Sequence, residues 1–455
     1  MRPMDAPRER PPLPEGPYLV VGMARSGQAA ARLLAGRGDE VIGTDSGTPE
    51  GAAELGEAGV ELALGTDGLA QLERARCVVK SPGVPAEAPV IAAARERGVA
   101  VIGELELAWR LLPNPFVAVT GTNGKTTVAE LLGEIWRAAG RPVAVAGNVG
   151  TPVASLVGKL SGEATVICEC SSFQLEDSEA FAPECGVLLN VSPDHLDRHG
   201  TLDDYLQAKL RIFAHQGNDD AAVYSGDEPA LRGRDLGGCG RRIAFCAESS
   251  GDDCDVTLAG PAIEAVGEPL LEASELQLLG AHNVANAMAA AAAALAMGIE
   301  REAIAAGLTS FPGVPHRLEA VGEVEGVRYV NDSKATNVAA ARAAVLSFEG
   351  GVHLILGGSS KGEGFEELAD PVARACVACY LIGETAGLIE ADLAPAWDAG
   401  VAHERCEGLA AAVRAAAENA RQGEVVLLAP ACASFDDYRD YAERGQHFKE
   451  LVKGL

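Results

Sequence analysis

Short apolar runs alternate along most of the chain with glycine-containing turns and with segments whose apolar residues recur at helical spacing. The first unit predicts a strand at Tyr18 to Val21, a turn at Gly22 to Gly27, a helix to about Leu34 and a strand in "EVIGTD". Fully apolar strands joined by helices are typical of parallel sheets that helices cover on both faces. The pattern therefore predicts an α/β fold.

The strand, turn and helix pattern restarts twice further along. A second series begins at "FVAVT", and a third follows the proline-containing segment "SFPGVPHRLEAVG" at 310–322. At 455 residues the chain is longer than one ordinary domain. We therefore predict a flexible tail at 1–16, a Rossmann-like domain at 17–112, a central α/β domain at 113–314 and a Rossmann-like α/β domain at 315–455.

Two segments of the central part differ from this pattern. Residues 218–276 are richer in Gly and Asp, and we interpret them as shorter strands added to the second sheet. The longest apolar stretch, "NVANAMAAAAAALAMGI", is rich in alanine and contains Asn286. These features are typical of a buried helix rather than a membrane span.

The net charge is −28, and the isoelectric point is near 4.7. This charge disfavours binding to nucleic acid or to anionic membranes, because both require clustered Lys and Arg. The 11 cysteines are scattered and often lie in apolar runs, which is typical of a reducing cytosol. Cys376 and Cys379 are interpreted as buried thiols rather than a zinc or redox pair. Because the N-terminal segment has no apolar signal-peptide core, we expect a cytoplasmic protein.

The first glycine turn, "GMARSG", resembles the dinucleotide-binding pattern G-x-G-x-x-G. Gly22 and Gly27 are in register, but Ala24 stands where a middle glycine lets the backbone approach a pyrophosphate. Asp45, at the end of the next strand, could bind a ribose hydroxyl. From this turn alone, three interpretations stay open: a nicotinamide cofactor, a differently placed nucleotide such as a UDP-sugar, and no ligand.

The second glycine turn, "TGTNGKTT", lies between an apolar strand and a helix. Its backbone N–H groups favour phosphate, Lys125 is placed to neutralise β- and γ-phosphate charge, and Thr126 offers a hydroxyl to Mg²⁺. The usual phosphate-loop spacing fails, because Val119 stands where the first glycine is expected and Gly121 makes a tighter loop. A glycine turn without a ligand is disfavoured by the strand and the helix on either side.

Carboxylates for a Mg²⁺-nucleotide are expected at the ends of other strands in the same domain. Glu169 ends the strand in "VICECSSFQ". The segment "SPDHLDRHG" follows another strand and contains Asp194, His195, Asp197 and His199. Not all four of these side chains can be metal ligands, and at least two are expected only to cap the next helix.

The helix "TLDDYLQAKLRIF" contains an unusual inward lysine. Thr201 and Asp204 are expected to cap its start. The inward stripe consists of Leu202, Leu206, Leu210 and Phe213. Lys209 shares this stripe, which usually indicates a snorkelling or paired cation. The alternative is a reactive amine, because burial lowers a lysine pKa and would permit reaction with CO₂.

Eight short motifs occur in order between residues 121 and 438, within a resemblance that runs from about residue 17 to the C-terminus: "GTNGKTT", "ECSSFQLE", "DHLDRH", "QAKLRIF", "GAHNVANAMAA", "PHRLE", "NDSKATN" and "PACASFDDY". This set resembles the Mur ligases, and "SSFQL" and "PACASFD" resemble the members that add D-glutamate. The resemblance implies a cytoplasmic, ATP-dependent ligase that joins UDP-N-acetylmuramoyl-L-alanine (UDP-MurNAc-L-alanine) to D-glutamate through an acyl phosphate in peptidoglycan precursor synthesis. It also implies a UDP-binding first domain, a central P-loop ATPase α/β domain that binds ATP and a last domain that binds the amino acid.

On the ATP side, the resemblance implies roles for individual residues. The ATP loop would comprise Gly121, Thr122, Asn123, Gly124, Lys125, Thr126 and Thr127, with adenine at Asn286 and further ATP-side groups at Arg317, Asp332 and Lys334. One Mg²⁺ is expected at Thr126 and Glu169, and a second at His195 and a carbamylated Lys209. The expected catalytic residues are Lys125, His195, Lys209 and Asn148.

The resemblance also implies binding residues for the two other substrates. The UDP-sugar is expected at Arg25, Ser26, Asp45, Ser46 and Gly83, with Asn148 at a pyrophosphate or sugar contact. Gly47 stands where some relatives have an arginine. D-Glutamate is expected at Thr336, Lys361, Ser434, Phe435 and Tyr441, and a tyrosine here replaces a family phenylalanine.

Three other functions stay open. A folylpolyglutamate synthase would share the phosphate loop but is not expected to begin with a uridine-type domain. A nicotinamide oxidoreductase and a nucleotide-gated binding protein without ligation are disfavoured by Ala24 and by the complete Mg²⁺ set. No feature favours a protein partner, and we expect a monomer.

Overall fold

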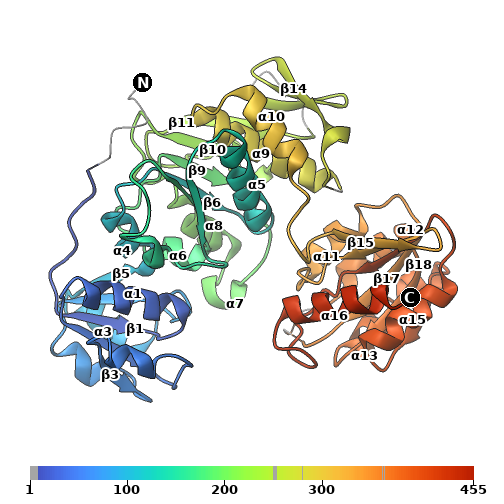
Figure 1. Ribbon diagram of the computed structural model, residues 1–455. Helices are drawn as coiled ribbons and strands as arrows, with labels where there is room; N and C mark the ends of the chain where they lie inside the picture. Colours follow the sequence, from blue (N-terminus) through green and yellow to red (C-terminus); the bar gives the residue numbers. More distant parts are fainter. Residues whose placement is uncertain (1–8, 249–253, 279, 361, 363) are drawn as a thin grey trace. The chain divides into compact units, whose positions relative to one another are not determined.

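The structure is a computed structural model that describes residues 9–248, 254–278, 280–360, 362 and 364–455 (Figure 1). Two compact units divide the chain. The first extends to Glu275 and includes Ala285–Ser310, and the second contains Leu276–Val284 and Phe311–Leu455. The described residues form three mainly parallel sheets, two in the first unit and one in the second. The predicted three-domain α/β class is confirmed, whereas the limits at 112/113 and 314/315 stay predictions.

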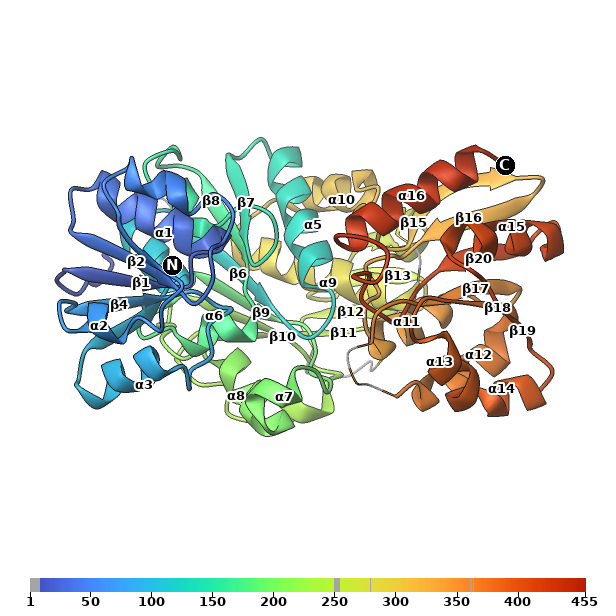
Figure 2. The same ribbon diagram turned by 90° about the horizontal axis from the view of Figure 1, so that it is seen from below.

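The first sheet follows the N-terminal segment. Its elements are β1 (Tyr18–Val21), α1 (Arg25–Gly36), β2 (Val41–Asp45), β3 (Glu61–Leu64), α2 (Leu69–Leu72), β4 (Cys77–Lys80), α3 (Pro89–Glu96), β5 (Ala100–Gly103) and α4 (Glu104–Leu111). The strand order is β3-β2-β1-β4-β5 with every pair parallel. Figure 2 shows α1 on one face and α3 on the other. The turns after β1, β2 and β4 therefore open at one carboxyl edge, where parallel sheets bind ligands.

The second sheet forms the rest of the first unit. Its elements are β6 (Phe116–Thr120), α5 (Lys125–Ala138), β7 (Val143–Gly147), β8 (Thr165–Glu169), α6 (Ser172–Glu176), β9 (Cys185–Leu188), α7 (Leu196–His199), α8 (Leu202–Leu210), β10 (Ala221–Ser225), β11 (Arg241–Cys246), β12 (Val256–Ala259), β13 (Ala262–Ala265), β14 (Glu268–Glu272), α9 (Ala281–Ala296) and α10 (Arg301–Ser310). The order is β14-β13-β12-β11-β10-β9-β6-β8-β7. β6 lies between β9 and β8, so the loops after these three strands meet.

Two predictions for the central part are confirmed. The strands β10 to β14 occupy the less periodic segment, and β13 and β14 extend the sheet by antiparallel pairing. The alanine-rich helix is α9, and its residues Ala287–Ala294 are at most 1% exposed. Within the described residues, none of the helices has both the length and the apolar character needed to cross a membrane.

The third sheet forms the second unit. Its elements are β15 (Glu319–Val324), β16 (Val327–Asn331), α11 (Val338–Val345), β17 (Val352–Gly357), α12 (Ala369–Ala375), β18 (Cys376–Ile382), α13 (Ala386–Asp392), α14 (Ala394–Asp398), β19 (Ala402–Arg405), α15 (Leu409–Asn419), β20 (Val425–Leu428) and α16 (Tyr441–Lys453). The order is β15-β16-β20-β17-β18-β19, and only β15 is antiparallel. The loops after β16, β20 and β17 therefore leave the same edge.

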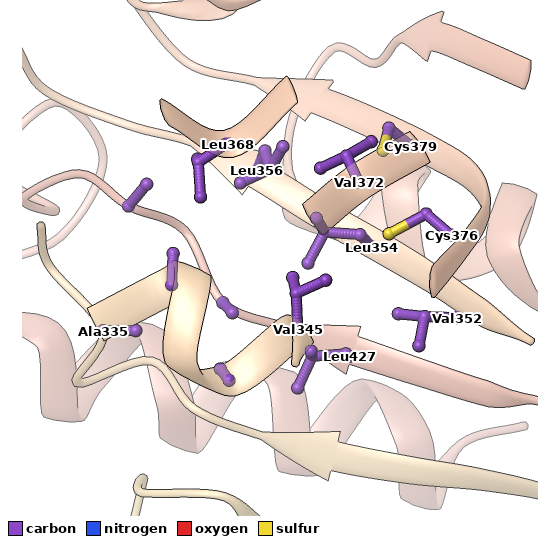
Figure 3. Packing of buried hydrophobic residues seen from close by; sticks show 14 of the residues in the cluster. Ala335, Val345, Val352, Leu354, Leu356, Leu368, Val372, Cys376, Cys379 and Leu427 are labelled. Atoms are coloured by element: carbon purple, nitrogen blue, oxygen red, sulfur yellow. The ribbon is translucent and has the colours of Figure 1, made fainter. Parts of the chain in front are cut away.

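The core on one face of the third sheet explains two of its cysteines. Leu354 of β17 packs near Val345 of α11 and Val372 of α12 (Figure 3). Cys376 and Cys379 belong to the same core as free thiols. The interpretation of this pair as buried thiols is confirmed.

The N-terminal segment differs from its prediction. Arg10 lies in the predicted flexible tail, yet its side chain is only 4% exposed and its Nη2 lies 3.1 Å from Glu184 Oε1. Its guanidinium also lies 4.4 Å from the Trp109 ring centroid, a geometry in which the ring face attracts a cation. The flexible-tail prediction is therefore wrong for the segment around Arg10, while residues 1–8 lie outside the described residues.

Two further expectations need correction. Cys246 and Cys254 form a disulfide, so the expectation of reduced cysteines fails at this pair. Cys246 ends β11, and Cys254 precedes β12, the strand that pairs with β11. Their Cα atoms are 6.0 Å apart, which is a normal separation for a disulfide. Leu202 is 38% exposed because it is the first residue of α8, so the inward stripe begins only at the next turn.

Buried charged side chains lie where the first two sheets meet. Lys80 of β4 donates to Asp177 across 2.5 Å, and both side chains are buried. Glu104 begins α4, and its Oε1 accepts a 2.7 Å hydrogen bond from the Ala154 N–H. Its Oε2 is buried without a hydrogen-bond partner among the described residues. Burial raises the pKa of Glu104 to about 7, because the charged form loses its hydration.

We expect Glu104 to make folding stability fall as the pH rises. The folded carboxyl keeps its proton up to a pKa of about 7, whereas the ordinary value is 4.5, so the folded state binds more protons between these values. Thermal unfolding midpoints across this window should decline less in Glu104→Gln than in the parent. Glu96→Gln, at an exposed position, is the control and should follow the parent. Equal declines in Glu104→Gln and the parent would contradict this account.

Candidate active site

The predicted phosphate loop is a tight turn between β6 and α5. Gly124 ends it with φ +86°, a left-handed conformation that favours glycine. A Cβ atom at this position would lie 2.4 Å from Asn286 Oδ1. The loop backbone therefore runs directly against Asn286, and the predicted ATP contact at Asn286 stays a prediction. The first N–H groups of the 14-residue helix α5 face the loop, as an anion site requires.

Asn190, which the sequence analysis did not select, fixes the loop. Its Oδ1 accepts from the Asn123 N–H at 2.8 Å, and its Nδ2 donates to the Asn123 carbonyl at 3.1 Å. The Asn190 carbonyl accepts from the Thr122 N–H at 3.0 Å. The only signal for this role in the sequence is a polar residue directly after the apolar run of β9, the strand that pairs with β6.

Lys125 lies folded onto the loop backbone. Its Nζ donates to the carbonyls of Gly121 at 2.9 Å and Thr122 at 2.8 Å. These neutral carbonyls hold the ammonium beside the phosphate loop. A bound phosphate would attract it more strongly than they do, because a charged acceptor makes a stronger hydrogen bond.

Thr126, on the first turn of α5, comes together with Glu169 at the end of β8 and Asn148 directly after β7. Thr126 Oγ1 donates to Glu169 Oε2 at 2.8 Å, and Asn148 Nδ2 donates to Glu169 Oε1 at 3.1 Å. Glu169 is 3% exposed. A buried carboxylate beside a hydroxyl, next to a phosphate loop, is a suitable donor set for a Mg²⁺ ion that also binds phosphate oxygens.

Lys209 is fully buried beside the loop, at 1% exposure. Its Nζ donates to the Gly121 carbonyl at 2.8 Å and lies 4.2 Å from the Tyr205 ring centroid. Burial lowers the pKa of Lys209 well below its ordinary value, and the positive charge of Lys125 lowers it further. The snorkelling interpretation is therefore wrong, and the lowered pKa favours the uncharged, nucleophilic form of this amine.

His195 is placed differently from the other predicted metal ligands. It has a left-handed backbone with φ +54°, and its side chain is half exposed. Its ring lies 5.0 Å from Phe173, and its Nε2 lies 3.7 Å from Asp194 Oδ2. Among the contacts of the described residues, none joins His195 to Thr126, Glu169 or Lys209. In the described part of the chain, no three His, Cys, Asp or Glu side chains gather as a metal site.

The expectation that some of the polar residues in this segment have structural roles is supported. His199 stacks on Phe173 with ring centroids 5.2 Å apart and bonds to Ser172 at 3.0 Å. Burial lowers the pKa of His199, which favours its neutral form. The predicted cap of α8 is confirmed, because Thr201 Oγ1 accepts from the Asp204 N–H at 3.1 Å. The side chain of Asp197 lies outside the described residues.

A cavity of about 730 Å³ opens at the carboxyl edge of the first sheet. All six predicted UDP-sugar residues line it: Arg25, Ser26, Asp45, Ser46, Gly83 and Asn148. Asp45 also accepts from the N–H groups of Met23 at 2.7 Å and Gly47 at 2.8 Å, so its carboxylate shapes the two turns it joins. Asn148 belongs to the second sheet and also contacts Glu169, which connects the cavity to the phosphate loop.

Arg198 joins the cavity wall to the segment that carries His195. Its Nη2 donates to the Val84 carbonyl at 2.7 Å and the Pro82 carbonyl at 3.3 Å. Its guanidinium also lies 4.4 Å from the Phe173 ring centroid. Arg198 therefore connects the cavity wall near Gly83 to Phe173, the ring that contacts both His195 and His199.

The described residues predicted for the second unit lie at one edge of the third sheet, on loops except for Tyr441, which begins α16. Asp332 follows β16, and burial raises its pKa to about 6, although the charge of Arg317 opposes this shift. Lys334 Nζ lies 5.7 Å from the Tyr441 ring centroid. Ser434 is buried, Phe435 is 73% exposed, and Thr336 is partly buried. Lys361 lies outside the described residues.

The second sheet carries a phosphate loop between a strand and a helix, and the first sheet carries a cavity at its carboxyl edge. Together these features define a nucleotide-binding α/β enzyme. Residues 17–103 match the MurD-like N-terminal domain of Mur ligases, residues 119–294 the Mur ligase middle domain, and residues 316–432 the Mur ligase, glutamate ligase domain. The chain therefore belongs to the Mur ligase family. Members of this family are ligases that use ATP.

Relatives match the chain over nearly its whole length. The UDP-N-acetylmuramoylalanine–D-glutamate ligase of Pelotomaculum thermopropionicum is 43% identical over 96% of this chain and 97% of its own. The protein of the same name from Acidobacterium capsulatum is 42% identical over 95% of both chains. Among solved structures, UDP-N-acetylmuramate–alanine ligase MurC of Thermotoga maritima has a TM-score of 0.61 at 20% identity, covering 97% of this chain and 100% of its own. At that identity the likeness shows the shared fold.

We expect Asn190→Ala to weaken nucleotide binding. The substitution removes both side-chain bonds to Asn123, so the loop N–H groups are no longer held in place for phosphate. Losing a pair of hydrogen bonds corresponds to about 1–2 kcal/mol, or roughly a tenfold rise in the Kd for ADP by calorimetry. Asn218→Ala, at an exposed position, is the control and should bind as the parent does. An unchanged Kd in Asn190→Ala would exclude this anchoring role.

Proposed function

We propose that this chain joins the L-alanine carboxylate of UDP-MurNAc-L-alanine to the amine of D-glutamate at the expense of ATP. The observation that carries the proposal is 43% identity over 96% of the chain to a protein named for this reaction. The cavity lined by all six predicted UDP-sugar residues supports the same substrate. A folylpolyglutamate synthase is a weaker candidate, because this first domain is the MurD-like one.

The proposed reaction has two steps. The substrate carboxylate attacks the γ-phosphorus of ATP, so a C–O–P bond forms and ADP leaves. The D-glutamate amine then attacks the acyl carbon, the amide bond forms, phosphate leaves and the amine loses a proton. Neither step requires a nucleophile from the enzyme, so catalysis consists of positioning the reactants and neutralising their charge.

The residues around the loop suit those two tasks. The N–H groups of Gly121 to Thr127 and the ammonium of Lys125 would hold the β- and γ-phosphates. Asn148 is placed to orient the reacting end of the UDP substrate, because it lines the cavity and contacts Glu169. Asn286 would hold adenine. Arg317, Asp332 and Lys334 would supply further ATP-side groups, and D-glutamate would be held by Thr336, Lys361, Ser434, Phe435 and Tyr441.

We further propose two Mg²⁺ sites. Thr126 and Glu169 would hold one ion, and His195 with a carbamylated Lys209 would hold the second. When bound, Mg²⁺ supplies charge neutralisation at the transferring phosphate. The neutral Lys209 amine would add to CO₂, which forms a C–N bond and releases a proton. The resulting carbamate supplies a second carboxylate-like group in a site where Glu169 is the carboxylate next to the loop.

The reaction is proposed to occur in the cytoplasm, in a monomer. The cysteines other than the Cys246–Cys254 pair are free thiols, which supports a reducing compartment.

Phosphate release from ATP tests the substrate proposal. The assay contains Mg²⁺, UDP-MurNAc-L-alanine and, in separate reactions, D-glutamate, L-glutamate or no amino acid. We expect sustained phosphate release only when both substrates are present, with D-glutamate strongly preferred. Equal rates with the two glutamate enantiomers, or release that does not need the UDP substrate, would sink the proposal.

The carbamate proposal predicts that Lys209→Ala loses at least about a hundredfold in kcat and that a small carboxylate such as formate restores part of it. Lys159→Ala, at an exposed position, is the control and should keep the parent kcat. A second measurement does not depend on activity: ¹³C NMR of protein equilibrated with ¹³C-bicarbonate should give a carbamate signal in the parent and in Lys159→Ala. The same signal in Lys209→Ala, or full activity of that variant, would rule out the carbamate.

A further inference from the structure

Arg444, on the first turn of α16, is a buried cation to which the sequence analysis assigned no function. It is 1% exposed, and the described carboxylates form no ion pair with it. Its guanidinium is surrounded instead by oxygen acceptors of two loops. Burial lowers its pKa to about 10, so it still carries its charge at neutral pH.

All three nitrogen atoms of the Arg444 guanidinium donate hydrogen bonds. Nε donates to Ser333 Oγ at 3.0 Å, and Nη2 donates to the Ser333 carbonyl at 2.9 Å. Nη2 also donates to the Cys432 carbonyl and Nη1 to the Ala433 carbonyl, each at 3.0 Å. One side chain therefore fixes the backbone of the loop after β16 and that of the loop after β20, on two adjacent parallel strands.

A third loop packs against the same group. Gly358 follows β17, and a Cβ atom there would lie 2.2 Å from the Ala433 carbonyl and 3.0 Å from Arg444 Nη1. Ser359 donates its N–H to the Ala433 carbonyl at 3.0 Å. The loop after β20 also contains Ala431 in the left-handed conformation with φ +59°, a strained geometry that persists only when neighbouring groups impose it.

We propose that Arg444 is a positioning residue that sets the amino-acid side of the active site. The inference rests on the proposed function, because the loops that it joins carry two of the proposed D-glutamate residues, Thr336 after β16 and Ser434 after β20. Ser333 Oγ extends the network by donating to the Tyr441 carbonyl at 2.7 Å, at the start of α16. The guanidinium orders these groups through the backbone and does not touch the substrate.

Lysine cannot replace this arginine. A guanidinium presents five N–H donors in a rigid plane, whereas an ammonium presents three donors on a flexible stem. Arg444→Lys keeps the charge but cannot reach the acceptors of both loops together. It therefore separates loss of loop positioning from loss of the buried cation.

The test measures KM for each substrate in Arg444→Lys. The parent is assayed first, and its dependence on D-glutamate tests the proposed function separately. In Arg444→Lys we expect KM for D-glutamate to rise at least about tenfold, with KM for UDP-MurNAc-L-alanine within about twofold, because the UDP cavity belongs to the first unit. Added guanidinium ions should lower the raised KM in Arg444→Ala. Arg439→Lys is the matched control, since Arg439 is exposed, and it should match the parent.

The outcomes are decisive in either direction. A folded Arg444→Lys variant whose KM for D-glutamate is unchanged, or whose KM values all change equally, overturns the proposal. If Arg444→Lys does not fold, Ser333→Ala removes only the acceptor of the Nε bond and the donor to Tyr441. In folded Ser333→Ala, KM for D-glutamate must rise relative to the parent by about threefold more than KM for the UDP substrate does. Equal fold-changes of the two KM values overturn the proposal.

Discussion

Two lysine side chains converge on one backbone carbonyl, that of Gly121, and the arrangement of the site depends on how two amino groups are accommodated there. Lys125 and Lys209 both donate to this oxygen, at 2.9 and 2.8 Å. Burial lowers the pKa of Lys209, and the positive charge of Lys125 beside the shared acceptor lowers it further. The site therefore gains stability from anions brought to it: phosphate for the first lysine and, in our proposal, CO₂ converted to a carbamate at the second.

The second unit uses the same physical solution. Arg444 is surrounded by main-chain carbonyls and a hydroxyl, without a carboxylate partner among the described residues. Because carbonyl dipoles stabilise the cation, no carboxylate has to lie beside it and cancel its positive potential. This holds although the net charge of the chain is −28. Both units thus place buried lysine or arginine side chains next to predicted substrate residues, in a protein whose net charge is negative.

The sequence contained enough information for the parts of the site that depend on local chemistry. Gly124, Lys125 and Thr126 are adjacent in one loop, and Glu169 could be placed because it ends an apolar strand in the same sheet. Asn190 and Arg444 could not be found in this way. Each acts through main-chain atoms of a distant segment, and a single asparagine or arginine has no spacing rule that predicts such bonds. Arg10 was missed for a related reason, since the aromatic ring it covers is far away in the sequence.

The position of Arg10 has a practical consequence for anyone who shortens or tags the chain. The apolar pattern places the first strand at Tyr18, so a trimmed form would naturally begin just before it. Such a form would lose the cation that lies over Trp109 and pairs with Glu184, and also the Pro12 carbonyl that accepts from Arg110. The eight residues before this strand therefore act as part of the seam between the first two domains, and a useful truncation should end before Arg10.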